Sequence, residues 1–412
     1  MERSPALSDH PRRPTTRSVS TPVRARDARI DAFRGLALIM ILIDHMPGNP
    51  WEALTIRNIG FSDAAEAFFI MSGIAAGIAY SPAIIRWLNH DTRLWDAVGP
   101  MWKRAWKLYT VHILLTVVAI ALYAWAAEMF LREEFRIVHN LGILFDRPGP
   151  AMIGMVTLGY QIGYVNILPT YMVLLIIGPM VIAAGLYAPR LTILAAFALW
   201  LFAGATQLNL PNNPGGGGWF FNPFTWQFIF VIGLVIGINH RTNSRFFPLS
   251  PLMFKIALGF LIFAFAWRYM PVLGPFMNHK MLQLGALGAP ANIVTHDKSM
   301  LALPRLLHAV ALVYVLASLP VVSRICAHRA AAPLRLMGRQ GLLVFGLGTA
   351  LALFGQILMV IEPHVMWLPW VLPVVGAGLC YGAAVIADTA KHQFHGKAKG
   401  QTFSTGAPVS IT

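Results

Sequence analysis

Long apolar runs recur along nearly the whole chain, separated by short polar segments. A helix needs about 20 mostly apolar residues to cross the hydrocarbon core of a bilayer. A transmembrane β-barrel would instead show short segments of alternating hydrophobicity. The pattern therefore predicts an all-α polytopic membrane protein with about ten transmembrane helices, at residues 33–48, 64–81, 109–129, 165–186, 190–207, 224–239, 252–270, 304–322, 341–361 and 366–387.

The distribution of basic residues predicts how these spans are oriented. The chain has 412 residues and a formal net charge of +15, which in a soluble protein would suggest a nucleic-acid partner. With ten spans and an inner N-terminus, 24 Lys and Arg fall in the inner segments and only eight in the outer ones. Cytoplasmic loops of membrane proteins carry this excess. We therefore expect both termini to be cytoplasmic, membrane lipids as partners, and no nucleic acid.

Three regions differ in composition. Residues 1–28 form a basic arm rich in Pro, Ser and Thr with no apolar period, which predicts disorder. Residues 29–387 form the membrane domain, and the polar residues 388–412 are predicted to be a flexible cytoplasmic tail. Residues 82–107 contain four tryptophans among basic residues and predict an amphipathic helix on the cytoplasmic surface. The two cysteines are far apart, so we infer no disulfide framework and no metal site.

Ionisable residues are concentrated in and beside the first two spans, with Asp44, His45, Asp63 and Glu66 as candidate catalytic residues. Each such group costs on the order of 2.5–3.5 kcal/mol inside a bilayer, so several together indicate function. Arg34 lies three helical turns before His45 on the same face, at the inner end of the span. In the second span, the glycines at 73 and 77 predict close approach of another helix.

His45 is either a packing residue that hydrogen-bonds a neighbouring helix or a general base for a hydroxyl nucleophile. We favour the base, because histidine titrates nearest neutral pH. Asp63 or Glu66 would orient its ring and stabilise the imidazolium, as the third member of a catalytic triad does. Arg34 is either a topological anchor or a contact for phosphate or carbonyl oxygens.

The outer loops supply candidate substrate-binding residues. Trp219 and Asn222 follow a run of four glycines, and such a loop suits either an interfacial aromatic belt or stacking against sugar rings. Lys298, Arg305 and His308 cluster near the start of the eighth span and predict a site for an anionic group. Arg57, between the first two spans, is a further candidate.

Several phrases of the chain resemble the OpgC family, which succinylates osmoregulated periplasmic glucans, within the acyltransferase-3-type membrane acyltransferases. They are RIDAFRGLAL at 29–38, IDHMPGNPWEALTIRNIGFSDAAEAFFIMSG at 43–73, KRAWKLYTVH at 103–112, ILPTYMVLL at 167–175, GGGWFFNPFTWQ at 216–227 and DKSMLALPRLLH at 297–308. The resemblance covers most of 29–360. It implies a ten-span fold in the bacterial inner membrane and a site centred on His45.

The resemblance also implies the reaction. A cytoplasmic acyl-CoA, succinyl-CoA by family, would be the donor substrate, with no tightly bound cofactor, and a periplasmic glucan would be the acceptor. Residues alone leave a second class open, namely a carrier or export channel for a polar solute that uses the same buried charges as a passage. The absence of two halves with matched interrupted helices argues against a secondary transporter.

Overall fold

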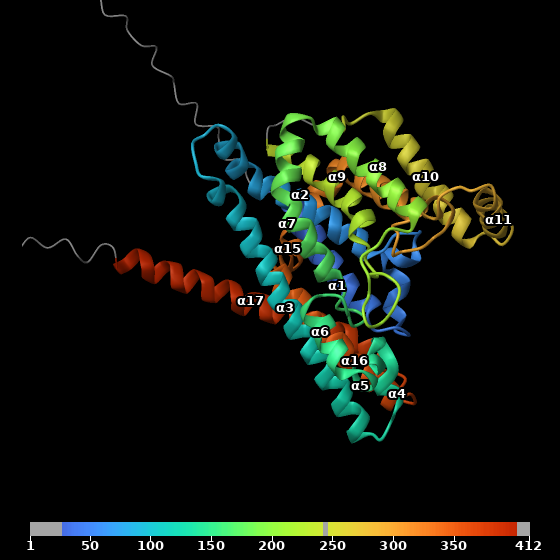
Figure 1. The fold of residues 1–412 in the computed structure, drawn as a ribbon. Helices are drawn as coiled ribbons and strands as arrows, with labels where there is room; N and C mark the ends of the chain where they lie inside the picture. Colours follow the sequence, from blue (N-terminus) through green and yellow to red (C-terminus); the bar gives the residue numbers. More distant parts are fainter. Residues whose placement is uncertain (1–26, 242–245, 402–412) are drawn as a thin grey trace, which may run out of the picture.

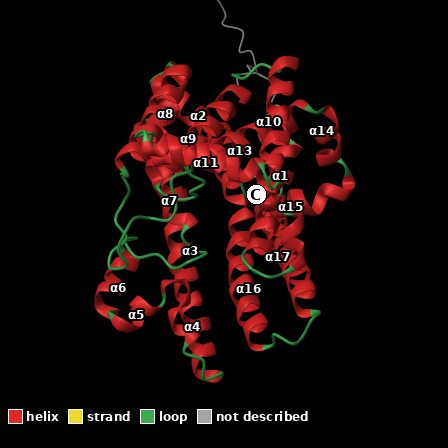
Figure 2. Ribbon diagram, turned by 90° about the vertical axis from the view of Figure 1, so that its right-hand side faces the viewer, coloured by secondary structure: helices red, strands yellow, loops and turns green. Residues whose placement is uncertain are grey.

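The computed structural model describes residues 27–241 and 246–401. Side chains are described for residues 27–240 and 246–393. This part is helical, without a β-strand. Figures 1 and 2 show the helices packed as one bundle, and Figure 1 shows α17 projecting from it. Its α-helices are α1 (Ala28–Asp44), α2 (Ala64–Leu88), α3 (Leu94–Met129), α4 (Glu134–Ile137), α5 (Gly142–Asp146), α6 (Pro148–Val156), α7 (Ile167–Tyr187), α8 (Pro189–Thr206), α9 (Pro223–Arg241), α10 (Pro251–Tyr269), α11 (Leu273–Ala286), α12 (Ala291–Val294), α13 (Leu303–Ser318), α14 (Pro320–Ala327), α15 (Ala332–Arg339), α16 (Gly341–Ile361) and α17 (Leu368–Gln401).

The structure confirms the all-α membrane architecture. Among the described residues, eight helices are long and apolar enough to cross a membrane, and a bent pair brings the number to nine. The bent pair is α13 and α14, which meet at 80° where Pro320 follows Leu319. The remaining predicted span corresponds to α1, whose 17 residues rise about 25 Å, less than the hydrocarbon thickness of about 30 Å. The prediction that both termini are cytoplasmic concerns residues outside the described part of the chain.

Two segments differ from their predicted form. Residues 82–107, predicted as one surface helix, are divided between two long helices. Residues 82–88 are the last turns of α2, and residues 94–107 are the first turns of α3, whose 36 residues rise about 54 Å. The tryptophans there are exposed, with Trp106 at 69%, so they lie on the outer face of this part of α3, whose other face buries Ala97, Met101 and Ala105. The helix α17 continues to Gln401 across the predicted boundary at 387, and the rest of the tail lies outside the described residues.

The helices α2 and α9 approach each other closely in the core. A Cβ atom added to Gly73 would lie 2.2 Å from the carbonyl oxygen of Phe230, and one added to Gly77 would lie 2.3 Å from that of Leu234. The facing helix has the same kind of close contact, since a Cβ atom added to Gly233 would lie 2.2 Å from the carbonyl oxygen of Ile70. The predicted small-residue contact is confirmed, and it fixes the position of α2, which begins at the candidate site.

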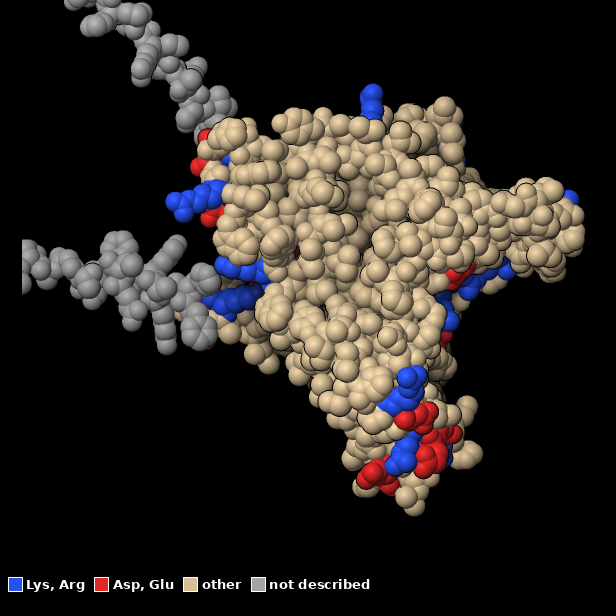
Figure 3. All heavy atoms as spheres, in the orientation of Figure 1, with Lys and Arg blue, Asp and Glu red and all other residues tan. Residues whose placement is uncertain are grey.

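Uncharged side chains cover a broad face of the molecule, as Figure 3 shows, and charged groups gather toward its ends. The group at the lower end, over α4, includes Arg132, Glu133, Glu134 and Arg136. On α10 only Ala264 and Trp267 are buried, although the helix has 19 residues. An apolar surface of this extent suits contact with lipid.

Candidate active site

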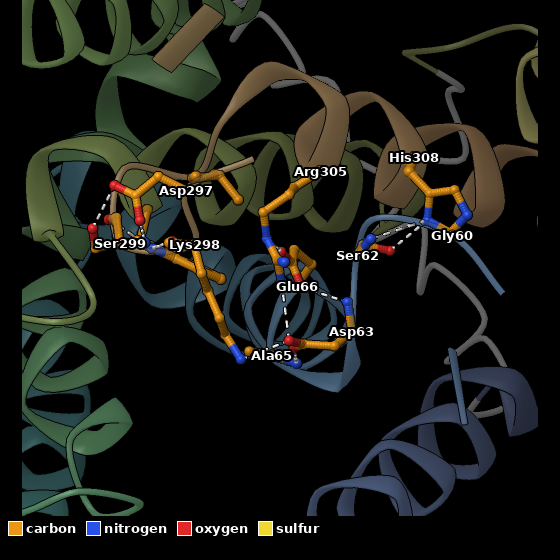
Figure 4. Close-up of polar contacts among 12 residues, drawn as sticks. Gly60, Ser62, Asp63, Ala65, Glu66, Asp297, Lys298, Ser299, Arg305 and His308 are labelled. Carbon is orange, nitrogen blue, oxygen red and sulfur yellow. Dashed lines mark hydrogen bonds and ion pairs between the residues drawn. The ribbon is translucent and has the colours of Figure 1, made fainter. Parts of the chain in front are cut away.

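Four ion-paired side chains lie where α2 and α13 begin, as Figure 4 shows. Lys298 Nζ lies 2.6 Å from Asp63 Oδ2, and Arg305 Nη2 lies 3.0 Å from the same oxygen. Arg305 Nε donates to Glu66 Oε1 at 2.7 Å. We call Asp63, Glu66, Lys298 and Arg305 the charge cluster. It joins segments more than 230 residues apart in the chain.

Local helix capping places both acids of the charge cluster. Asp63 is the N-cap of α2, and its carboxylate accepts a hydrogen bond from the backbone N–H of Ala65 at 2.8 Å. Glu66 Oε2 in turn accepts from the backbone N–H of Asp63 at 2.9 Å, which completes a capping box. Burial alone would raise the pKa of Asp63, but Lys298 and Arg305 outweigh burial and hold it below its usual range. Asp63 is therefore a carboxylate at neutral pH.

A second contact locks the same end of α13. The Ser62 hydroxyl lies 2.7 Å from His308 Nδ1, and the backbone N–H of Ser62 approaches that nitrogen at 3.4 Å. On its other side the ring fills the space of a missing side chain, because a Cβ on Gly60 would lie 2.0 Å from Nε2. His308 is 1% exposed. We therefore read His308 as a packing and positioning residue, in contrast to its predicted role as an anion ligand.

His45 follows the last residue of α1 and lies near the charge cluster. Lys298 and Asp63 are close enough to influence its ring electrostatically. The ring packs on Tyr164 with centroids 4.4 Å apart. Its Nδ1 atom is buried and has no hydrogen-bond partner among the described residues. The expected contact of Asp63 or Glu66 with the ring is not formed, because Lys298 and Arg305 already hold both acids.

The backbone of His45 is held by groups that the sequence did not single out. Gln356 of α16 donates from Nε2 to the His45 carbonyl oxygen. That bond fixes the orientation of the amide, so its Oε1 accepts from Tyr123 at 2.9 Å and from His139 Nε2 at 2.8 Å. Burial lowers the pKa of His139, although the bond to Gln356 opposes the shift. A lone glutamine in an apolar span was the one signal that could have revealed this network.

The loop after His45 is held by Asp44 and Asn49. Asp44 Oδ1 accepts from the Thr55 hydroxyl at 2.8 Å. Asn49 Nδ2 donates to the carbonyl oxygens of Ile43 and Met46 at the C-terminal end of α1, at 2.9 and 2.7 Å. These bonds tie the Asn49 side chain to the end of α1 and to the turn that follows it. Asp44 thus fixes the loop beside His45 rather than the imidazole itself.

The glycine-rich loop differs from its prediction. Trp219 is 6% exposed and Asn222 is fully buried, so neither is an open stacking platform. Asn222 Oδ1 accepts from the backbone N–H of Phe224 at 3.0 Å, and its Nδ2 donates to Leu208 O at 2.7 Å. Asn222 therefore holds the start of α9. The exposed aromatic residue is Phe220, at 47%.

The predicted basic ligands also have partners. Lys298 and Arg305 both pair with acids of the charge cluster, so neither cation is unpaired in the structure. Lys298 is the more accessible of the two, at 30% side-chain exposure. The Arg57 side chain is half exposed, and its Nη1 lies 3.9 Å from Glu52 Oε2. Arg34 lies far along α1 with its Cδ beside Gly341, at the N-terminus of α16.

These features define a multi-pass α-helical membrane protein with a polar site at one end of its bundle. In the part of the chain that the structure describes, no three His, Cys, Asp or Glu side chains are grouped to hold a metal ion. A family model described as OpgC protein matches residues 26–392, so the chain belongs to the OpgC protein family. Comparisons with curated proteins and with solved structures gave no match. Family membership supports a role in modifying osmoregulated periplasmic glucans.

Proposed function

We propose that the protein is a membrane O-acyltransferase that moves a succinyl or related acyl group from a cytoplasmic acyl-CoA to a hydroxyl of a periplasmic glucan. The observation that carries the proposal is the environment of His45. Its backbone carbonyl is held by Gln356 and its ring is packed on Tyr164, while Nδ1 has no partner among the described residues. A histidine fixed in place but not consumed by internal hydrogen bonds suits a proton acceptor.

In the reaction that we propose, a ring nitrogen of His45 removes the proton of the acceptor hydroxyl. The hydroxyl oxygen attacks the thioester carbonyl, a C–O bond forms, and the C–S bond breaks. The imidazolium then returns its proton to the CoA thiolate. The Asp63 carboxylate favours the imidazolium through space, whereas the ammonium of Lys298 opposes it, so a substrate carboxylate that pairs with Lys298 would ease the proton transfer.

The two cations of the charge cluster take different parts. Arg305 contacts both acids and is 12% exposed, so we assign it to holding α13 on α2. Lys298 contacts only Asp63 and keeps donor capacity for the carboxylate of a succinyl group. Arg34, at the far end of α1, would contact the phosphates of the CoA arm. Donor and acceptor would thus reach His45 from opposite ends of the helix.

The test is the charge of the periplasmic glucans. Glucans from a deletion strain and from the same strain complemented with the parent chain would be separated by anion exchange, before and after mild alkaline hydrolysis of esters. We expect anionic, alkali-labile glucans only in the complemented strain. A carrier or export channel would change the amount or location of glucan but leave its charge per molecule unchanged, and that result would overturn the proposal.

A further inference from the structure

A polar cavity of about 410 Å³ lies beside the charge cluster. This volume falls within the range of about 300–1,000 Å³ typical of small-molecule sites. The cavity lies where α8 ends and where α7, α9 and α13 begin. It is lined by Asn140, Gln161, Asn166, Gln207, Asn209, Asn212, Gly218, Trp219, Phe220, Asp297, Ser299 and Met300.

Half of the lining residues are carboxamides, and none is Lys, Arg or His. Each carboxamide has both an acceptor oxygen and an NH₂ donor, which is the combination that matches sugar hydroxyls. Two aromatic side chains, Trp219 and Phe220, complete the wall. The single carboxylate, Asp297, accepts from the Ser299 hydroxyl at 2.6 Å. A wall with one negative charge and no cation favours a neutral, polyhydroxylated ligand over an anion.

Two of the carboxamides have oxygens that lack a partner. Gln161 Oε1 and Asn212 Oδ1 are buried, and no described group hydrogen-bonds either one. Gln161 is 5% exposed, and its Nε2 is already bound to Leu158 O at 3.1 Å. Buried polar atoms in folded proteins are normally hydrogen-bonded, so each exception calls for a missing partner. Hydroxyl donors of a ligand in the cavity would supply it.

The glycine run shapes this wall. Gly216 and Gly217 have φ of 79° and 69°, a conformation that glycine adopts without a steric penalty. The turn that they form brings the chain back on itself, so that Trp219 N–H donates to Leu210 O at 2.9 Å. Asn209 Nδ2 then binds Trp219 O at 2.9 Å. The loop thereby presents its asparagines and its aromatic residues to the same space.

The cavity and the charge cluster share one short segment. Asp297 and Ser299 line the cavity, while Lys298 between them reaches the other way to Asp63, as Figure 4 shows. The Lys298 ammonium also lies 6.0 Å from the ring centroid of Phe220, which lines the cavity. A ligand held by the carboxamides is therefore next to the groups that surround His45.

We propose that this cavity is the subsite for the unmodified acceptor, and that it binds the neutral sugar rings of the glucan through Gln161 and Asn212. The proposal rests on the proposed function for the identity of the sugar. Exposed residues at the rim, Asn140, Gln207 and Gly218, leave room for the rest of a long glucan to pass out of the cavity. Because no cation lines the wall, the cavity prefers acceptor over succinylated product.

Binding without any acyl donor tests the proposal. The full chain in detergent would be titrated with end-labelled neutral glucan from the deletion strain, for the parent and for Gln161→Leu, Asn212→Leu and their combination. We expect each single variant to weaken binding roughly 3- to 10-fold, the range that one lost hydrogen bond gives. Gln283→Leu is the matched control, since that exposed carboxamide on α11 is bound to Lys280 and His279 outside the cavity.

Three further results decide the proposal. Unchanged binding in the double variant, at an unchanged unfolding midpoint, would overturn it. Chemically succinylated glucan should bind the parent several-fold more weakly than neutral glucan, and tighter binding of the succinylated form would also overturn it. His45→Ala should keep full glucan binding while it loses transfer. Transfer that persists in His45→Ala would therefore contradict the proposed function alone, and the cavity would stand.

Discussion

The charge cluster and the surroundings of His45 lie close together but are built in opposite ways. In the charge cluster two cations face two carboxylates, and the buried Glu66 at 0% exposure has both oxygens occupied. At His45 the backbone is held and the ring is packed, yet Nδ1 has no partner among the described residues. A network in which every charge is paired stabilises a structure. A side chain that is held in place but has an unpaired polar atom can instead bind or react with a ligand. The contacts of Arg305 and Glu66 hold the structure together, whereas the proposed function places the proton transfer at His45.

Arg305→Ala disrupts the charge cluster and should have the largest effect on folding. The variant leaves Glu66 buried and without its cation, which costs about 3–5 kcal/mol for a buried pair broken on one side. We expect a large loss of folded protein in size-exclusion profiles of detergent extracts, together with a lowered unfolding midpoint.

The matched control for this variant is Arg136→Ala. Arg136 also pairs with acids, but its side chain is 42% exposed and those of Glu128 and Glu133 are 79% and 83% exposed. Such surface pairs contribute about 0–1 kcal/mol. If both variants lower the midpoint equally, the charge cluster has no special structural role.

Gly60→Ala tests the lock between the loop and α13. The added methyl group would overlap the His308 ring, so the ring must move and its bond to Ser62 is lost. Overpacking of this kind costs about 1–3 kcal/mol. We expect a measurable drop in the unfolding midpoint, with none in Gly259→Ala, where an added Cβ meets nothing within 4 Å. Equal unfolding midpoints for the two variants would show that the His308 ring can move aside without loss of stability.

Arg34→Lys should have the smallest effect, and it tests whether donor handling is separate from the chemistry at His45. Lysine keeps the positive charge but loses the planar fork that grips phosphate oxygens. We expect normal insertion and a rise of about tenfold in the acyl-CoA concentration needed for half-maximal rate, equivalent to about 1.4 kcal/mol. Inverted membrane vesicles titrated with succinyl-CoA would measure it. An unchanged donor requirement would leave Arg34 as an anchor.

The sequence predicted the spans well because their signal is local. Apolar runs predicted both ends of α7, α8, α10 and α16 to within two residues. Gly73 and Gly77 correctly predicted the close approach of another helix. The structure brings Asp63 and Glu66, predicted at the start of the second span, into contact with Lys298 and Arg305, predicted near the start of the eighth.

Partner choice could not be predicted, because it depends on how each helix is rotated and how deeply each loop is buried. Lys298 and Arg305 were predicted to bind an anionic group, but the capping geometry of α2 directs the side chains of Asp63 and Glu66 toward them. Asn222 was expected at the surface, yet it is buried at the start of α9. The roles of Gln356 and His139 arise only when α16 meets the end of α1.

The most direct test of the account is the rate of acyl transfer by His45→Ala. Membrane vesicles with the variant would receive saturating succinyl-CoA and unmodified glucan, and ester formation would be followed against the parent and against His279→Ala, an exposed histidine on α11. We predict a loss of about 10²–10⁴-fold for His45→Ala, as expected for an acid–base group, at an unchanged unfolding midpoint and with no rescue by donor. A near-normal rate at normal expression would contradict the central role of His45.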